Sequence, residues 1–327
     1  MESNKAVIEW LLSADEPWTR YRTRLDLLDQ GEDDPFVVRD REEMLRHPFV
    51  RGLISTAQSW PGYALKRHND TKHPIQSLSV LADFGLKYSD PGMDKVVQRV
   101  LAHQSEEGAF ETLMGLYKRF AGLDGEHWVW MGCDAPVLLY ALTAFGCGDL
   151  REVLCARDQL AALIKENGWP CSASPKLGSF KGPGKRSDPC PLANLLALKA
   201  FSRIEGIRES DVVLPAIVML LDHWENRGEK KFYLFGIGTD FKKLKYPLIW
   251  YDILHAADVL SHYPAALSDP RFQELVSVIS DQADHQGGYT ASSMYMAWKG
   301  WSFANKKEPS PWLTFLVERI NKRIVAL

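Results

Sequence analysis

The stretch Ser187-Asp188-Pro189-Cys190-Pro191 opens the apolar segment that decides the fold of this chain. After it, apolar residues recur on more than one helical face, which is the pattern of a helix buried on all sides. Asp188 is a favourable N-cap residue, and proline is tolerated in the first helical turn. Cys190 then lies in the positive field of the helix N-terminus, which favours its thiolate form. The stretch therefore predicts an inner helix and a candidate reactive thiol.

The composition is that of an ordinary globular protein. The chain has 327 residues, of which 46% are hydrophobic and 25% charged, with a formal net charge of −3. This excludes a strongly basic nucleic-acid-binding surface and allows a large core. No apolar run approaches the roughly 18–20 residues of a membrane span, and no signal peptide is recognised. We expect a cytoplasmic protein with no nucleic-acid partner and no membrane span, and the sequence identifies no protein partner.

A repeat of about 60 residues runs through most of the chain. Five apolar helical segments begin at a proline, and successive starts are 62, 55, 56 and 64 residues apart. These prolines are Pro74, Pro136, Pro191, Pro247 and Pro311. Amphipathic segments lie between them, at residues 94–103, 149–166, 211–226 and 269–283. The simplest arrangement is a layer of apolar inner helices surrounded by a layer of amphipathic outer helices.

Similar polar turns follow three of the amphipathic segments. Each turn has a polar residue, then a glycine and then an aromatic residue, at Gln104–Phe110, Glu166–Trp169 and Gln282–Tyr289. Glycine permits the turn, and the aromatic side chain packs into the next repeat. Upstream, three helical segments form an N-terminal extension of about 65 residues, at 17–28, from 35 and at 48–60. We therefore expect one all-α domain over residues 1–327, with strand patterns nearly absent.

These helix pairs and turns resemble the α/α toroid of squalene cyclases and protein prenyltransferase β subunits. The chain is most similar to small bacterial proteins described as prenyltransferase-like or squalene-cyclase-like, of which Cys133–Pro136 and Trp250–His255 are typical segments. The resemblance extends from about residue 10 to the C-terminus. It implies a toroid that binds an isoprenoid or other apolar molecule in a central cavity, with zinc-assisted prenyl transfer or cyclisation as the chemistry. The alternative is a non-catalytic ligand-binding or scaffold protein with the same fold.

The resemblance also implies a zinc site. In prenyltransferase β subunits, an Asp-x-Cys motif at the start of an inner helix and a histidine about 60 residues later hold the metal, and Asp188 and Cys190 match the motif. Asp252 takes the place of the histidine, and His255 lies three residues further on nearly the same helix face. Zinc suits thiolate and imidazole better than two carboxylates, so His255 is a candidate substitute. The alternative is that Asp188 is a cap and that Cys190 and His255 are core residues.

A rival metal set consists of three thiols, Cys133, Cys171 and Cys190. Cys133 and Cys190 precede equivalent inner helices, so a toroid would place them at one rim, and Cys171 follows one of the glycine turns. Candidate fourth ligands are Asp134, Asp188 and His127. The spacing lacks the CxxC pattern of a closed structural site, and cysteine is often simply buried. The five cysteines of the chain are irregularly spaced, which is typical of free thiols or ligands and not of a disulfide framework.

The candidate catalytic groups are single residues, because the Asp-x-Asp-Asp acid motif of terpene cyclases is absent from the sequence. They are Asp134, Asp252 and His255. A carboxyl group serves as an acid only where its surroundings adjust its pKa. Cyclisation of the usual kind is therefore disfavoured.

The remaining candidates would bind the substrate. Aromatic residues that would line the cavity are Trp128, Trp130, Tyr140, Trp169, Trp250, Tyr251 and Trp312, although a large helical core also needs such side chains. Two basic loops precede inner helices and would hold a diphosphate. Their candidate residues are Lys181, Lys185, Arg186, Lys243 and Lys245. The alternative for both loops is an ordinary solvated connection.

Overall fold

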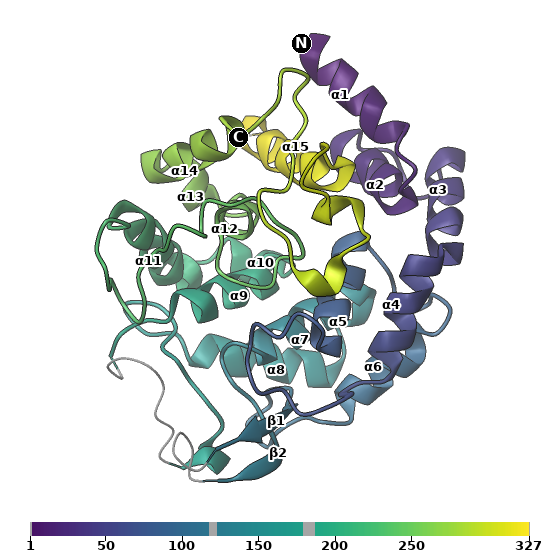
Figure 1. Ribbon diagram of the computed structural model, residues 1–327. Helices are drawn as coiled ribbons and strands as arrows, with labels where there is room; N and C mark the ends of the chain where they lie inside the picture. Colours follow the sequence, from purple (N-terminus) through teal and green to yellow (C-terminus); the bar gives the residue numbers. More distant parts are fainter. Residues whose placement is uncertain (1, 118–122, 179–186, 327) are drawn as a thin grey trace. The chain divides into compact units, whose positions relative to one another are not determined.

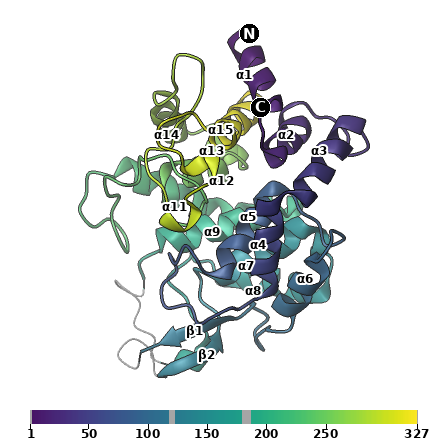
Figure 2. The same cartoon turned by 45° about the vertical axis from the view of Figure 1, so that its right-hand side comes forward.

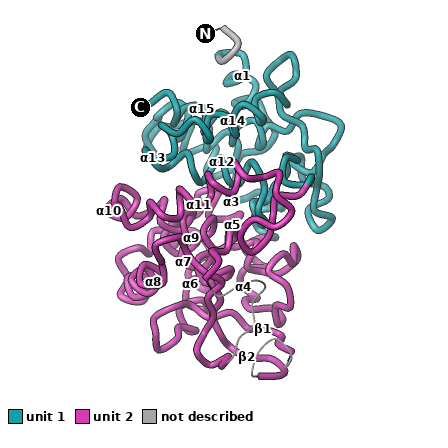
Figure 3. Tube along the Cα trace, turned by 90° about the vertical axis from the view of Figure 1, so that its left-hand side faces the viewer, with its two compact units in different colours: residues 1–52, 239–327 teal, residues 53–238 magenta. Residues whose placement is uncertain are grey.

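The computed structural model describes residues 2–117, 123–178 and 187–326. Within these ranges the chain is mainly α-helical, as predicted, with fifteen α-helices and one small sheet (Figure 1). It forms two compact units: unit 1 comprises residues 1–52 and 239–327, and unit 2 comprises residues 53–238 (Figure 3). None of the described helices combines the length and apolar character that a membrane span requires. The single toroidal domain stays a prediction.

Most helices begin where a proline or an acidic residue marks their start, as expected from their sequence. The helices of unit 1 are α1 (Glu2–Leu12), α2 (Pro17–Arg22), α3 (Pro35–Arg46), α12 (Ile253–Leu260), α13 (Pro264–Leu267), α14 (Pro270–Ser280) and α15 (Pro311–Val325). Those of unit 2 are α5 (Pro74–Phe84), α6 (Met93–Leu101), α7 (Ala135–Leu142), α8 (Arg151–Ala162), α9 (Pro191–Phe201), α10 (Glu205–Arg208) and α11 (Leu214–Glu225). Helix α4 (Pro48–Gln58) crosses the boundary between the units.

The interior of unit 2 is built on three apolar helices. Every residue of α5 and of α9 is buried, and α7 packs against both (Figures 1 and 2). Helix α6 is instead amphipathic, with Met93, Val96, Val97 and Val100 on its buried face. Spacing of i, i+3, i+4 and i+7 leaves the opposite face polar. The predicted distinction between apolar and amphipathic helices is therefore confirmed for these elements.

A buried ion pair links two of the apolar helices. Lys199 of α9 lies 3.2 Å from the carboxylate of Asp83 in α5, and the Tyr140 hydroxyl donates to the same carboxylate at 2.6 Å. The Lys199 ammonium also lies 4.5 Å from the centre of the Tyr140 ring. Buried charges are tolerated when they are paired and hydrogen-bonded in this way. Tyr140, a predicted cavity-lining residue, is thus placed in the core of unit 2.

A short hairpin near residue 115 corrects the expectation that strands are almost absent. Strands β1 (Thr112–Leu116) and β2 (Gly125–Val129) pair antiparallel, with Thr112 opposite Val129. Burial alternates along β1, which is the period of a strand and not of a helix. Apolar side chains join this hairpin to neighbouring loops in one cluster, formed by Leu65, Met114, Leu116, Val129, Met131 and Leu177.

Two predicted helix starts are corrected. The apolar segment at Pro247 is not helical at its beginning: α12 starts at Ile253, because the Asp252 side chain accepts a hydrogen bond from the His255 N–H and caps the helix there. The N-cap of α9 is Cys190 and not Asp188. The Cys190 N–H bonds to the Trp169 carbonyl at 2.9 Å, so this residue still belongs to an extended segment, and the helix begins after it.

A buried side chain fixes the glycine turn before α9. Asn194, fully buried, accepts from the Trp169 N–H and donates to the Trp169 and Cys190 carbonyls, each at 2.8 Å. Unit 1 repeats the device: Thr314, three residues after the first proline of α15, accepts from the Tyr289 N–H at 2.9 Å. Two of the three predicted glycine turns therefore share the same type of side-chain hydrogen bond.

Replacing Gly168 should disrupt this turn. Gly168 has a φ of +99°, and an added Cβ would lie 2.4 Å from Asn194 Oδ1. We expect Gly168→Ala to lower the free energy of unfolding by about 1–3 kcal/mol, measured by urea denaturation. The matched control is Gly206→Ala in α10, where no neighbouring atom lies within 4 Å of the added Cβ. Equal effects of the two substitutions would contradict the proposed strain.

Candidate functional site

Three cysteines from separate segments of unit 2 form the candidate site, which we call the thiol cluster: Cys133, Cys171 and Cys190. Backbone pairing aligns the first two. The Gly132 N–H bonds to the Ser172 carbonyl and the Ser174 N–H to the Trp130 carbonyl, both at 2.9 Å. This antiparallel register puts Cys133 opposite Cys171.

The third cysteine is brought in by a second backbone pairing. Pro170 pairs with Pro189, and the Cys190 N–H bonds to the Trp169 carbonyl. The Asn194 amide holds both ends of this pairing, as described above. Cys133 and Cys190 are buried and Cys171 is partly buried. The predicted convergence of these thiols is therefore visible in the fold of unit 2.

Hydrogen bonds among the three thiols shift the pKa values of Cys133 and Cys190 in opposite directions. Hydrogen bonds from Cys133 and Cys171, together with the Ala193 and Leu192 N–H groups at the start of α9, hold the pKa of Cys190 well below its usual range despite burial. Interactions with Cys171 and Cys190 raise the pKa of Cys133 well above its usual range. The shift of the Cys190 pKa has the direction that the field of the helix N-terminus predicts.

An imidazole and a carboxylate adjoin the thiol cluster. Asp134, which follows Cys133 directly and is the N-cap of α7, is buried. His68 Nδ1 lies 3.0 and 3.1 Å from the two carboxylate oxygens of Asp134. Burial lowers the pKa of His68, but the negative charges of Asp134 and Cys190 outweigh that effect and raise it. Sequence reasoning missed His68, because a histidine in an irregular loop carries no local signal of its partner.

The candidate fourth ligands have other surroundings. His127 lies on β2, where its Nε2 is 2.9 Å from the Asp124 carbonyl oxygen. Asp188 is partly exposed, and Asp134 binds His68. In the described ranges, no group of three or more His, Cys, Asp or Glu side chains has the arrangement of a ready-made metal site. The thiols instead hydrogen-bond to one another, and a metal ion would have to displace their protons and draw the sulfur atoms around itself.

The zinc set implied by the resemblance is divided between the units. Asp188 and Cys190 belong to unit 2, whereas Asp252 and His255 belong to unit 1. Both unit 1 residues are fully buried, and His255 Nδ1 lies 2.9 Å from the Trp250 carbonyl oxygen. That ligand set remains a prediction.

Asp252 is a titratable carboxyl group in the interior of unit 1. Its Oδ1 accepts the His255 N–H at 3.0 Å, while its Oδ2 has no hydrogen-bond partner within the described part of the chain. Burial raises the pKa of Asp252 to about 7, although the Lys245 ammonium acts in the opposite direction. A carboxyl group that is half-protonated near neutral pH has the property required of a general acid.

The predicted basic loops are only partly described. Lys181, Lys185 and Arg186 lie outside the described residues. In the other loop, Lys243 and Lys245 bind the two carboxylate oxygens of Asp240, at 2.8 and 2.9 Å. Lys245 is 4% exposed, and its ammonium pairs with the exposed carboxylate of Asp240.

Most of the predicted cavity-lining aromatic residues are packed in the core of their units. Trp169 is buried and its indole N–H donates to the Leu160 carbonyl, and Trp312 is fully buried beside Tyr246. Trp130 is also buried, whereas Trp128 is partly exposed and stacks on His103. In unit 1, Tyr251 is buried and Trp250 is partly exposed. The buried residues fit core packing, which was the alternative to a cavity lining, whereas Trp128 and Trp250 are partly exposed.

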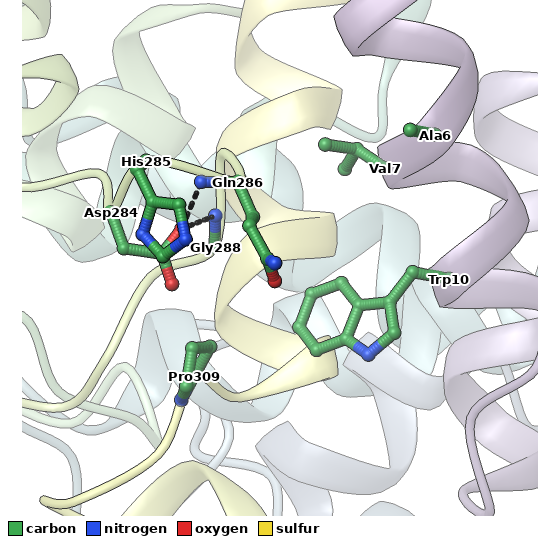
Figure 4. Close-up of a pocket in the computed structure, with 8 residues that line it drawn as sticks. All are labelled: Ala6, Val7, Trp10, Asp284, His285, Gln286, Gly288 and Pro309. Carbon is green, nitrogen blue, oxygen red and sulfur yellow. Dashed lines mark hydrogen bonds between the residues drawn. The ribbon is translucent and has the colours of Figure 1, made fainter.

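A surface pocket of unit 1 contains none of the predicted residues. It has a volume of about 460 Å³ and lies between Val7 and Trp10 of α1, the turn around Asp284, and Pro309 (Figure 4). Asp284 Oδ1 already accepts the N–H groups of Gln286 and Gly288, at 2.8 and 2.9 Å. Its carboxylate therefore stabilises the turn, and we assign no chemistry to this pocket.

Removing the charge of Asp252 should change how stability depends on pH. Between about pH 4 and pH 7 the folded Asp252 keeps a proton that the unfolded chain has released, so folding is penalised increasingly as the pH rises through this window. An asparagine side chain at this position would keep the capping ability without the charge. We expect the stability of Asp252→Asn relative to wild type to increase by about 2 kcal/mol between pH 5 and pH 8.

The measurement is urea denaturation of both proteins across this pH range. Burial also raises the pKa of Glu16 to about 7, but Glu16 is present in both proteins and cancels in the difference. A stability difference that stays constant with pH would contradict a raised pKa at Asp252.

Comparison with known proteins adds little to this description. No protein-family model matches the chain, and no curated protein matches it. Among solved structures, the chain is similar to one described as the crystal structure of a protein from Actinoplanes, at 12% sequence identity and a TM-score of 0.46, with 99% of each chain covered. At this level of similarity, the comparison defines neither the fold nor the function.

Proposed function

We propose that the chain is a zinc protein whose metal is held by the thiol cluster of unit 2. The observation that carries the proposal is the meeting of Cys133, Cys171 and Cys190 from three segments that are separate in sequence, each positioned by backbone hydrogen bonds. Thiolates are the preferred protein ligands of zinc. The Cys190 thiolate at the start of α9 supplies the first negative charge that a cation requires.

The chemistry of the zinc depends on its fourth position. A site with three protein ligands leaves a position open for water or substrate, whereas a site with four protein ligands is structural. The open form would suit the zinc-assisted transfer of an isoprenoid group that the resemblance implies. In either form, the chain's own residues hold three sulfur atoms: one just before α7, one at the N-terminus of α9 and one after the glycine turn.

The toroid and its apolar ligand belong to the same proposal. The packing of α5, α7 and α9 beside one another supports an inner layer, and the repeated turns before α9 and α15 support a repeating architecture. The non-catalytic alternative is favoured by one observation: Tyr140, Trp169 and Trp312 are buried in protein contacts and are not presented to a ligand.

Metal analysis tests the proposal directly. Protein purified without chelator or affinity tag should contain about one zinc ion per chain. Cys190→Ser and Cys133→Ser should each lose the metal while helix content, measured by circular dichroism, is retained. Cys155→Ser is the matched control, because Cys155 is an exposed free thiol of unit 2; it should keep the zinc.

Two outcomes would overturn the zinc assignment. One is metal-free wild-type protein that binds no zinc when it is added after reduction of the thiols. The other is equal zinc content in Cys190→Ser and Cys155→Ser. If a cluster variant does not fold, chelator treatment of the wild-type protein replaces it, with loss of thermal stability as the expected result.

A further inference from the structure

His68 lies beside the thiol cluster, because its ring binds Asp134, the residue that follows Cys133. Its loop is fixed at both ends: the Leu65 N–H bonds to the Leu113 carbonyl at 2.8 Å, and His73, the N-cap of α5, lies with its Nε2 3.0 Å from the Tyr63 carbonyl oxygen. Within this loop, His68 reaches the carboxylate of Asp134, the residue next to Cys133. The same backbone that aligns the thiols therefore also brings in an imidazole.

The hydrogen bond to Asp134 determines which ring nitrogen of His68 is left for a metal. Nδ1 donates to the carboxylate, so Nε2 is the nitrogen that carries the lone pair in the neutral ring. Metal-binding histidines usually have this arrangement, in which the second nitrogen donates to a carboxylate or carbonyl oxygen. The Asp134–His68 pair thus has the hydrogen bond that usually orients a zinc-binding imidazole.

The other histidines of this region contact backbone carbonyl oxygens and not a carboxylate next to a cluster cysteine. His73 uses both ring nitrogens on the backbone, with Nε2 near the Tyr63 carbonyl and Nδ1 accepting the Ile75 N–H. His127 lies on β2 and its Nε2 contacts the Asp124 carbonyl. His223 lies on α11, where its Nε2 is 2.8 Å from the Phe235 carbonyl oxygen.

We propose that Nε2 of His68 is the fourth protein ligand of the zinc held by Cys133, Cys171 and Cys190, and that Asp134 is the positioning residue for this imidazole. The inference rests on the proposed zinc site. It specifies that site as closed, with three sulfur donors and one nitrogen donor, and therefore structural. Zinc would then connect the loop before α5 with the starts of α7 and α9, and the protein would have no open metal position for a substrate.

Zinc affinity, measured by competition with a chromogenic chelator, tests the assignment. His68→Gly should weaken zinc binding by more than about 100-fold and Asp134→Asn by about 10–100-fold. His127→Ala, the control, should leave the affinity unchanged. Free imidazole should restore zinc binding to His68→Gly, an effect that a merely structural role of His68 would not produce.

Cobalt substitution gives a second readout that does not depend on activity. The Co²⁺ form of the wild-type protein should show the intense visible bands of a tetrahedral thiolate site, and His68→Gly should alter them until imidazole is added. Unchanged zinc affinity and an unchanged cobalt spectrum in His68→Gly would overturn the inference while leaving the thiol site intact. Loss of affinity in His223→Gln and not in His68→Gly would also overturn it. A wild-type protein that binds neither metal would overturn the zinc proposal itself.

Discussion

The buried amide of Asn194 is the constraint on which the site depends. Its oxygen and nitrogen bind the backbone of Trp169 and the carbonyl of Cys190 at once, so the glycine turn and the start of α9 cannot move independently. Each of these bonds is made away from water, where an unpaired amide would be costly. The positions of Cys171 and Cys190 follow from this clamp, because both lie within two residues of the atoms that it holds.

Around this clamp, unit 2 gathers negative charge at helix N-termini. Asp134 begins α7 and Cys190 begins α9, where the unpaired backbone N–H groups favour anions. A buried thiolate still needs a cation close by, since the helix field compensates only part of its desolvation. Among the described residues, the His68 imidazole interacts with the charge of Cys190, and the proposed zinc ion would compensate that charge more completely by binding all three sulfur atoms.

Much of this arrangement could be predicted from the sequence because it depends on local and periodic signals. The apolar runs after Pro74, Pro136 and Pro191 are long enough to identify buried helices, and the repeat places Cys133 and Cys190 at the same end. His68 could not be predicted, because 65 residues separate it from Cys133 and only the tertiary fold brings them together. The predicted start of α12 at Pro247 was wrong for a different reason: the helix begins only after Asp252, whose side chain caps it. The hairpin was missed because each of its two strands is only five residues long.

The atoms that coordinate the metal distinguish a zinc centre from a cluster of buried thiols. The direct measurement is X-ray absorption at the zinc edge of the wild-type protein. The predicted result is three sulfur atoms at about 2.3 Å and one imidazole nitrogen at about 2.0–2.1 Å. Zinc that is coordinated mainly by oxygen, or by fewer than three sulfur atoms, would contradict a site built on Cys133, Cys171 and Cys190.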